Sequence, residues 1–415
     1  MKKYAVLTRE PRCFLGSLAF SWEQRKLGDI ADIVGGGTPS TGNQSYWDGD
    51  IDWYAPAEIA DQIYANSSQK KITGLGYENS SAKMLPPGTV LFTSRAGIGK
   101  TAILTRKGCT NQGFQSIVPH RGELDSYFIF SRTGELKRYG ELVGAGSTFV
   151  EVSGKQMAVM ELMMPPTMRE QQTIGGFFQQ LDNLITLHQR KFEKLTNVKK
   201  SMLEKMFPQN GCSYPEIRFK GFTDAWEQRK FDEVFDCTVP NNTLSRAELS
   251  YDEGTVLNVH YGDVLIKYGS VLDVQKDDIP RIPLRCREDF NGALLQDGDV
   301  IIADTAEDET TGKACEIGNL QGSAIVSGLH TMVCRPRNRM ALGYLGYYLN
   351  SNAYHHQLLP LMQGIKVLSL SRSNIQKTSV SYPIAVKEQQ LIADYFSQLD
   401  NLITLHQRKH LRLHP

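Results

Sequence analysis

The sequence predicts an α/β (α+β) protein with two sheet-rich globular blocks, two long antiparallel coiled-coil helices and an internal pseudo-twofold repeat. Two observations predict this fold class. First, the twelve residues QLDNLITLHQRK occur twice without change, at 180–191 and at 398–409. Second, short strand-like stretches bounded by Gly, Pro and Asn precede each copy, whereas apolar residues recur at helical spacing around it. A repeat of this length indicates two tandem units.

The repeat extends beyond the identical residues. A Glu-Gln-Gln triplet starts at Glu170 and at Glu388, with the same offset as the twelve-residue copies, and the sequence WEQRK starts at Trp22 and at Trp226. Weaker correspondences join PPGTVLF (86–92) to QDGDVII (296–302), and Gly113 of NQGFQSIVP to Gly328 of VSGLHTMVCRP. We therefore expect a first block with an N-terminal segment at 1–21, a first helix, a second block and a second helix, over residues 1–164, 165–210, 211–383 and 384–415.

Each block reads as a sheet-rich domain. Strands are expected at residues 30–40, 88–94, 99–105 and 115–119 in the first block, and at 256–269, 298–304 and 330–336 in the second. One helix is expected in each block, at 125–142 and at 342–359.

The pattern of the two repeated tails predicts long helices with an apolar seam. Apolar residues alternate at steps of four and three, which is a heptad ladder, and Pro165-Pro166 and Pro208 bound the first copy. The residues expected to pair the helices are Ile174, Phe178, Leu181, Ile185, His188, Phe192 and Leu195 in the first copy, and Ile392, Phe396, Leu399, Ile403 and His406 in the second. Antiparallel pairing would place the blocks at opposite ends, whereas the alternative is that each helix packs only on its own block. His188 and His406 hold the same seam position, where they either fix the register or remain partly exposed.

Composition limits the function classes. The net charge is +1, so any nucleic-acid contact must come from a local basic patch. The seven cysteines are odd in number and form no C-x-x-C pair, and the nine histidines form no metal-binding pattern, which argues against a disulfide framework and a zinc site. No apolar run approaches the roughly 20 residues of a membrane helix, so we expect no membrane partner and a cytoplasmic location.

Three patterns resemble catalytic motifs but lack essential parts. TSRAGIGKT (93–101) resembles a phosphate-binding loop, but Ser94 replaces its first glycine and both flanks read as strands, so a hairpin turn is expected. MMPPT (163–167) lacks the Asn and the aromatic residue of an adenine methyltransferase motif. Asp125, Glu135 and Lys137 have a nuclease-like spacing but fall in an expected helix. We predict a non-catalytic chain.

The two variable blocks with their shared E-Q-Q…LDNLI…HQRK tails resemble the specificity subunit of type I restriction–modification systems, together with WEQRKLGDIADIVGGGTPS, SRAGIGK and PEIRFKGFTDAWEQRK. This resemblance implies that each block is a target recognition domain for half of a split site in double-stranded DNA. It also implies two modification subunits that bind S-adenosylmethionine, and restriction–translocase subunits that use ATP and Mg. No cofactor is expected in this chain itself. The short second tail and the segment 1–21, which matches little of 213–225, depart from the pattern.

Loop residues at strand ends are the candidates for DNA contact. In the first block they are Gly37, Thr38, Ser94, Arg95, Lys100, Asn111 and Gln112, and in the second Lys267, Tyr268, Lys313 and His330. The asparagine and glutamine amides could contact adenine in a bidentate manner. Two other classes stay open: a coiled-coil scaffold protein without a DNA role, and a nucleotide hydrolase that uses GIGKT.

Overall fold

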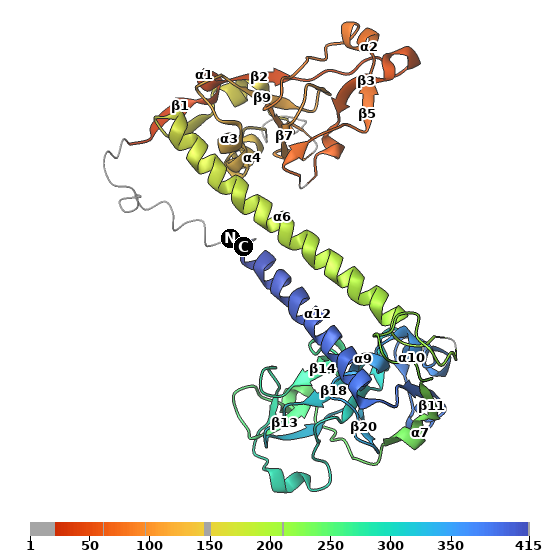
Figure 1. The fold of residues 1–415 in the computed structure, drawn as a ribbon. Coiled ribbons are helices and arrows are strands. Elements are labelled where there is room, and N and C mark those ends of the chain that lie inside the picture. Colours follow the sequence, from red (N-terminus) through yellow and green to blue (C-terminus); the bar gives the residue numbers. More distant parts are fainter. Residues whose placement is uncertain (1–20, 61, 96, 145–150, 210, 414–415) are drawn as a thin grey trace. The chain divides into compact units, whose positions relative to one another are not determined.

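The computed structural model describes the chain except residues 1–20, 61, 96, 145–150, 210 and 414–415 (Figure 1). The chain forms two compact units, one of residues 1–187 with 413–415 and one of residues 188–412. The boundary between them falls inside the long helix α6 (Met168–Lys205). Each unit therefore contains one sheet-rich block and part of the helical tail.

The first unit is built from three small sheets. A two-stranded antiparallel ribbon joins β1 (Glu23–Lys26) to β10 (Glu161–Met164). The five-stranded sheet has the order β2 (Ala31–Gly35), β9 (Gln115–Pro119), β6 (Val90–Phe92), β7 (Thr101–Leu104) and β4 (Tyr64–Ala65). The three-stranded sheet has the order β5 (Lys70–Ile72), β3 (Trp47–Tyr54) and β8 (Cys109–Thr110).

The second unit repeats this topology. Its ribbon joins β11 (Glu227–Lys230) to β22 (Ser379–Tyr382). Its five-stranded sheet has the order β12 (Phe235–Asp236), β20 (Thr331–Pro336), β16 (Val300–Ala303), β18 (Ala314–Gly318) and β14 (Val271–Asp273). Its three-stranded sheet has the order β15 (Arg281–Ile282), β13 (Val256–Val259) and β19 (Ala324–Ser327), and a further pair joins β17 (Thr305–Ala306) to β21 (Leu368–Ser369).

The strand directions match as well as the order. In both five-stranded sheets the last pair, β7–β4 and β18–β14, is parallel, and the other pairs are antiparallel. The central strands β6 and β16 are buried along their whole length, which explains why their sequences are apolar without alternation. The predicted internal repeat is therefore present at the level of topology.

Several predicted elements differ from the structure. The helix expected at 125–142 is two helices, α3 (Ser126–Ser131) and α4 (Thr133–Gly144), because the Thr133 hydroxyl bonds the carbonyl of Phe130 and breaks the turn between them. The helix expected at 342–359 is divided into α9 (Tyr344–Leu349) and α10 (Asn352–His355). Between them, the Asn350 amide bonds both the nitrogen and the carbonyl of Ala314 in the sheet, which fixes the chain there.

The strand expected at 256–269 is wrong over its second half. After β13 the chain forms helix α8 (Tyr261–Ile266), whose first turn is capped by the His260 side chain accepting from the Gly262 nitrogen. The remaining short α-helices of the described residues are α1 (Leu27–Ile30), α2 (Gly74–Glu78), α5 (Gly154–Ala158), α7 (Phe231–Val234) and α11 (Arg372–Ile375).

The long helices pack first on their own blocks. In α6, Ile174 and Phe178 lie against the core of the first block, whereas Ile392, Phe396 and Leu399 of α12 (Val386–Leu413) are buried in the core of the second. The alternative, in which each helix packs on its own block, therefore holds for the start of both helices. The later seam residues of the predicted ladder, Leu181, Ile185, His188, Phe192, Leu195, Ile403 and His406, are half-buried.

Within the second unit, α12 also runs antiparallel beside the C-terminal part of α6 (Figure 1). The Nδ1 atoms of His188 and His406 are 2.8 Å apart, and the Lys199 ammonium donates to Asp400 over 2.5 Å. Leu195 and Met202 pack against the core of this unit. His188 and Lys199 of α6 therefore both have partners on α12.

The repeated tail residues make the same bonds in both units. Asp182 accepts from the Tyr127 hydroxyl over 2.7 Å, and Asp400 accepts from that of Tyr347 over 2.9 Å. The buried amides of Gln171 and Gln389 each accept from a backbone nitrogen and donate to a backbone carbonyl of their own block. Identity between the tails thus reflects identical anchoring of two different blocks.

A buried ion pair in the second unit joins the segment after α6 to the start of α12. Glu388, which is 1% exposed, accepts both arms of the Arg218 guanidinium, over 2.7 and 2.9 Å, and the Trp226 indole nitrogen over 3.3 Å. Phe207, which follows α6, stacks on Phe396 with the ring centres 5.8 Å apart. The segment after α6 is therefore fixed to the start of α12.

We predict that Glu388→Ala lowers the free energy of unfolding of the second unit by about 3–5 kcal/mol, because it leaves a guanidinium poorly solvated and without its carboxylate. Hydrogen exchange of the α12 amides would measure this. The matched control is Glu170→Ala, the same residue of the first tail, which is more exposed and has no arginine partner among the described residues; its effect should stay below about 1 kcal/mol. Equal losses in both variants would contradict the assignment.

A second prediction concerns pH. Partial burial and the neighbouring His188, Lys191 and Lys409 lower the pKa of His406 in the folded chain below its usual value of 6.5. The unfolded chain therefore binds the proton more readily, and the helix pairing should weaken as the pH falls below 6.5. Urea midpoints at pH 7.5 and 5.5 should differ less in the His188→Leu/His406→Leu variant; an unchanged pH dependence would count against the histidine pair.

Candidate nucleic-acid interface

The hairpin between β6 and β7 carries the first group of candidate residues. Its strands pair antiparallel, which confirms the predicted hairpin turn in place of a phosphate-binding loop. The Thr93 hydroxyl donates to the carbonyl of Gly97 over 2.7 Å and accepts from the Lys100 nitrogen over 2.9 Å. Gly97 and Gly99 have φ angles of +107° and +94°, which only glycine adopts readily. Lys100 is exposed on this hairpin.

A second loop pair packs beside this hairpin. A Cβ atom on Gly36 would lie 1.9 Å from the carbonyl oxygen of Asn111, and the Gly37 nitrogen donates to the Thr110 carbonyl over 2.8 Å. The Trp53 indole donates to the Gly37 carbonyl over 2.8 Å. These glycines therefore allow two loops of the protein to approach each other. Gly37 is buried and its backbone groups are already bonded.

Four of the first-block candidates meet at the edge formed by these loops. The Thr38 hydroxyl donates to the side-chain carbonyl of the exposed Gln112. The Asn111 side chain accepts from the Gly113 nitrogen over 2.8 Å, and a Cβ atom built on Gly113 would lie 3.6 Å from Nε of the half-buried Arg95. We name Thr38, Arg95, Asn111 and Gln112 the first loop cluster. Ser94 lies beneath this cluster and is fully buried, so its side chain does not reach the surface.

In the second block, three candidates gather at the end of α8. The Lys313 ammonium donates to the carbonyls of Leu265 and Tyr268, over 2.8 and 3.2 Å, and so caps the helix. Burial lowers its pKa. Tyr268 is 3% exposed and belongs to the core. The structure thus gives Lys313 and Tyr268 stabilising roles, and Lys267 is the candidate here that reaches the surface.

Lys267 belongs to a small cation–aromatic cluster that the sequence did not reveal. Its ammonium lies 4.6 Å from the centre of the Tyr251 ring and 2.9 Å from Asp278. The Arg246 guanidinium lies 5.4 Å from the same ring and also binds Asp263 over 2.5 Å. Because Arg246 and Tyr251 occur in a long irregular segment, no periodicity marks them. We name Arg246, Tyr251 and Lys267 the second loop cluster.

His330 lies apart from the second loop cluster, on a different loop. Its ring is 5.3 Å from that of Tyr261, and its Nδ1 is 3.4 Å from Asp304. The backbone has a φ angle of +52° there, which is uncommon for a residue with a side chain. The structure therefore brings three of the four second-block candidates together at the end of α8 and places His330 on a different loop.

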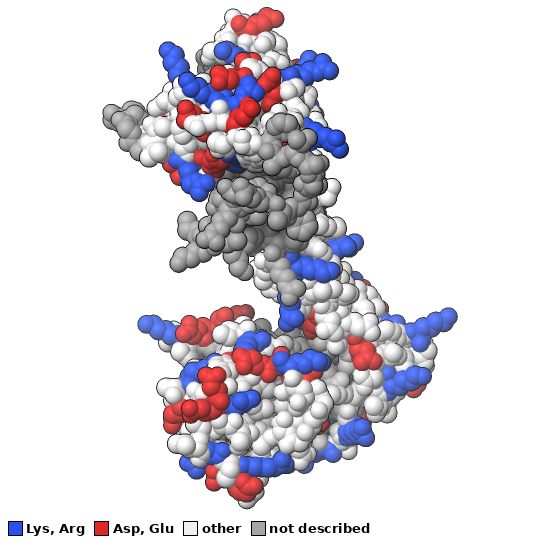
Figure 2. Space-filling model, turned by 90° about the vertical axis from the view of Figure 1, so that its left-hand side faces the viewer, with Lys and Arg blue, Asp and Glu red and all other residues white. Residues whose placement is uncertain are grey.

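The described surface carries charges of both signs. On the face shown in Figure 2, Lys and Arg alternate with Asp and Glu and do not form one continuous basic surface. Several of the basic residues, such as Arg246 and Lys267, are already paired with carboxylates. The phosphates of a bound duplex would have to compete with these carboxylates for the basic side chains. Such competition favours a small number of specific contacts over a broad electrostatic attraction.

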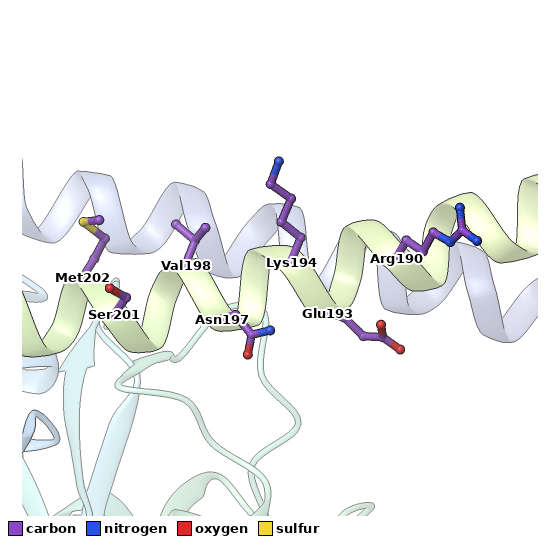
Figure 3. Close-up of a pocket in the computed structure, with 7 residues that line it drawn as sticks. All are labelled: Arg190, Glu193, Lys194, Asn197, Val198, Ser201 and Met202. Carbon is purple, nitrogen blue, oxygen red and sulfur yellow. The ribbon is translucent and has the colours of Figure 1, made fainter. Parts of the chain in front are cut away.

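A groove runs along α6. It is lined by Arg190, Glu193, Lys194, Asn197, Val198, Ser201 and Met202. Lys194, Val198 and Met202 point to one side of the helix, whereas Glu193 and Asn197 point to the other (Figure 3). Nowhere in the described part of the chain do three or more His, Cys, Asp or Glu residues gather as a metal site would require. The described helices also include none with the length and apolarity to cross a membrane.

Comparison with known proteins identifies relatives for both halves. The family described as the type I restriction modification DNA specificity domain matches residues 21–197 and again 223–414. Each match contains one block and its tail, in agreement with the internal repeat. The two matched ranges together make up most of the chain.

Individual relatives match over part of their length. The type I restriction enzyme MjaIX specificity subunit of Methanocaldococcus jannaschii is 32% identical over 255 residues, which are 59% of this chain and 59% of that protein. The EcoR124I/EcoR124II specificity subunit of Escherichia coli is 26% identical over 39% of this chain and 41% of its own. The type I restriction–modification S subunit of M. genitalium has a similar fold, with a TM-score of 0.52 and 12% identity over 96% of this chain and 95% of its own.

We predict that Gly36→Ala lowers the free energy of unfolding of the first unit by roughly 1–3 kcal/mol, because the new methyl group would collide with the Asn111 carbonyl. Urea unfolding would measure the loss. Gly42→Ala is the matched control, since its Cβ would lie 3.9 Å from the nearest atom and should be tolerated. If both variants were equally stable, the close loop contact would not be a constraint.

Proposed function

The chain belongs to the family of type I restriction modification DNA specificity domains, and from this premise we propose that it is the DNA-sequence-specificity subunit of a type I restriction–modification complex. It binds a bipartite, asymmetric duplex site, with one half-site at each block. The observation that carries this proposal is the combination of two blocks of one topology, which have different loop clusters, with tails that share twelve identical residues.

This combination suits the reading of two different half-sites. Loops on a fixed scaffold can change their side chains without changing the fold. The first loop cluster offers amide groups at Asn111 and Gln112, whereas the second offers a tyrosine between two cations at Arg246, Tyr251 and Lys267. Amides contact adenine and guanidinium groups contact guanine or phosphate, so the two blocks would prefer different bases.

The partners follow from the same proposal. Two modification subunits, which bind S-adenosylmethionine and methylate adenine, dock on the two equivalent tails, and restriction–translocase subunits use ATP and Mg. The chain itself contributes no catalytic residues and works in the cytoplasm. Equivalent tails support this arrangement, because two copies of one partner require two equivalent surfaces.

Mapping N6-methyladenine in cells tests the proposal. Cells that express the chain together with its methyltransferase partner should carry adenine methylation at one split sequence, and cells without the chain should lack it. Replacing the second block with that of a relative of other specificity should change only one half of the methylated sequence. A change in both halves of the methylated sequence, or in neither, would contradict the assignment of one half-site to each block.

Duplex binding in vitro separates this function from that of a scaffold without a DNA role. Binding by the complex should weaken steeply with salt. Arg95→Ala should reduce affinity through the first half-site only, so duplexes altered in that half-site should no longer distinguish the variant from the parent chain. A complex that ignores duplex DNA at low salt would favour the scaffold.

A further inference from the structure

Two cysteines face each other at the edge of the five-stranded sheet of the second unit. The edge strand β12 pairs antiparallel with β20, and the register places Asp236 opposite Arg335. One step further along this register brings Cys237 opposite Cys334, and their Sγ atoms share a hydrogen bond over 3.5 Å. Among the cysteines that the structure describes, these are the two whose thiols are bonded to each other. The sulfur atoms are therefore neighbours, although the residues are 97 positions apart in the sequence.

The first unit has an apolar pair at the corresponding place. The strands β2 and β9 hold the positions of β12 and β20 in its sheet, and their register places Ile33 opposite Ile117. Ile117 is the counterpart of Cys334, because the two lie opposite Val90 and Val300, the first residues of the central strands. Two isoleucines thus fill this place in one unit, so the packing of the sheet does not by itself require two thiols.

The pair combines a more acidic thiol with a less acidic one. Because Cys334 can donate to the Cys237 thiolate, their hydrogen bond lowers the pKa of Cys237 in spite of its burial, and Arg372 and Arg337 contribute in the same direction. The same bond, together with burial, raises the pKa of Cys334 well above its usual value. Cys237 is 7% exposed and Cys334 is 1% exposed. The thiolate is the reactive form of cysteine, so an oxidant attacks Cys237 first.

We propose that Cys237 and Cys334 form a reversible oxidation site, which takes a hydroperoxide as its oxidant and closes to a disulfide. The Cys237 thiolate attacks one oxygen of hydrogen peroxide, the O–O bond breaks, and the leaving hydroxide takes up a proton to form water. The sulfenic acid on Cys237 then reacts with the Cys334 thiol. In this step the S–S bond forms, the S–O bond breaks, and the hydroxyl leaves with the thiol proton as a second water. The two sulfurs together lose two electrons, which reduce the peroxide.

The strand geometry suits this bond. Directly opposed residues of an antiparallel pair have Cα atoms about 4.5–5.5 Å apart, and disulfides join Cα atoms about 4.4–6.8 Å apart. The two sulfurs can therefore join without a large movement of the backbone. The odd number and scattered positions of the cysteines fit a reducing compartment. There the pair stays as two thiols and closes only when peroxide is present.

The disulfide would fix the start of the segment that carries part of the second loop cluster. After Cys237 the chain continues to Arg246 and Tyr251, and β12 before it has only two residues paired with β20. A bond between Cys237 and Cys334 would add a covalent link at this weakly paired edge. The inference goes beyond DNA binding and does not depend on it, because its basis is the placement and acidity of two thiols.

Peroxide treatment of the full chain tests the proposal. The reduced protein is exposed to hydrogen peroxide, the remaining thiols are alkylated in denaturant, and the digested peptides are analysed by mass spectrometry. The peptides that contain Cys237 and Cys334 should be joined to each other, and dithiothreitol should separate them. Cys315 is the internal control, because burial raises its pKa to about 12, and it should remain open to alkylation.

Two single variants separate the roles of the two thiols. In Cys334→Ala the reaction should stop at the sulfenic acid of Cys237, which dimedone captures. In Cys237→Ala the Cys334 thiol should remain unreacted, because its raised pKa keeps it protonated. Urea unfolding gives a second readout. Peroxide should raise the midpoint of the parent chain, since a cross-link restricts the unfolded chain, and should not raise that of either variant.

Three results would overturn the proposal. One is that both thiols stay open to alkylation at a peroxide dose that oxidises the exposed Cys212 and Cys286. Another is a disulfide that forms only in denaturant, which would make it a property of the unfolded chain. The third is equal oxidation of Cys334 with and without Cys237, which would contradict the order of attack.

Discussion

The carboxylate of Glu388 holds together three parts of the second unit that are distant in sequence. Arg218 reaches it from the segment after α6, Trp226 from the start of β11, and Glu388 itself opens α12. Without this charge the guanidinium would remain poorly solvated, so the three segments are stable only together. The stacking of Phe207 and the antiparallel course of the helices depend on the same junction.

Much of the fold could be predicted because one part of the sequence is constant. The repeated tail revealed two units, and its heptad ladder revealed the helices, since burial follows the same spacing in α6. Prediction failed where a side chain decides the local structure. His260 caps a helix in a run that looks like a strand, and Asn350 interrupts an apolar helix by binding the sheet. The spacing of apolar residues alone gives no information about such hydrogen bonds.

The candidate interface was harder to predict than the fold. Position in a loop selected Thr38, Arg95, Asn111 and Gln112 of the first block, which the structure brings together, and their contact with DNA stays a prediction. It did not indicate which way a side chain points, so Ser94 and Tyr268 were included although the core contains them. The sequence did not single out Arg246 and Tyr251 beside Lys267, because their association depends on the fold of a long irregular segment.

The contact between His188 and His406 joins a residue to its own copy across the helix pair. A subunit interface with twofold symmetry has this property, but here both partners are encoded in one gene. A substitution at this position in one copy therefore creates a mismatched pair, and a matching change in the other copy restores it. The two coding segments should for this reason evolve in concert, while the blocks between them drift apart freely.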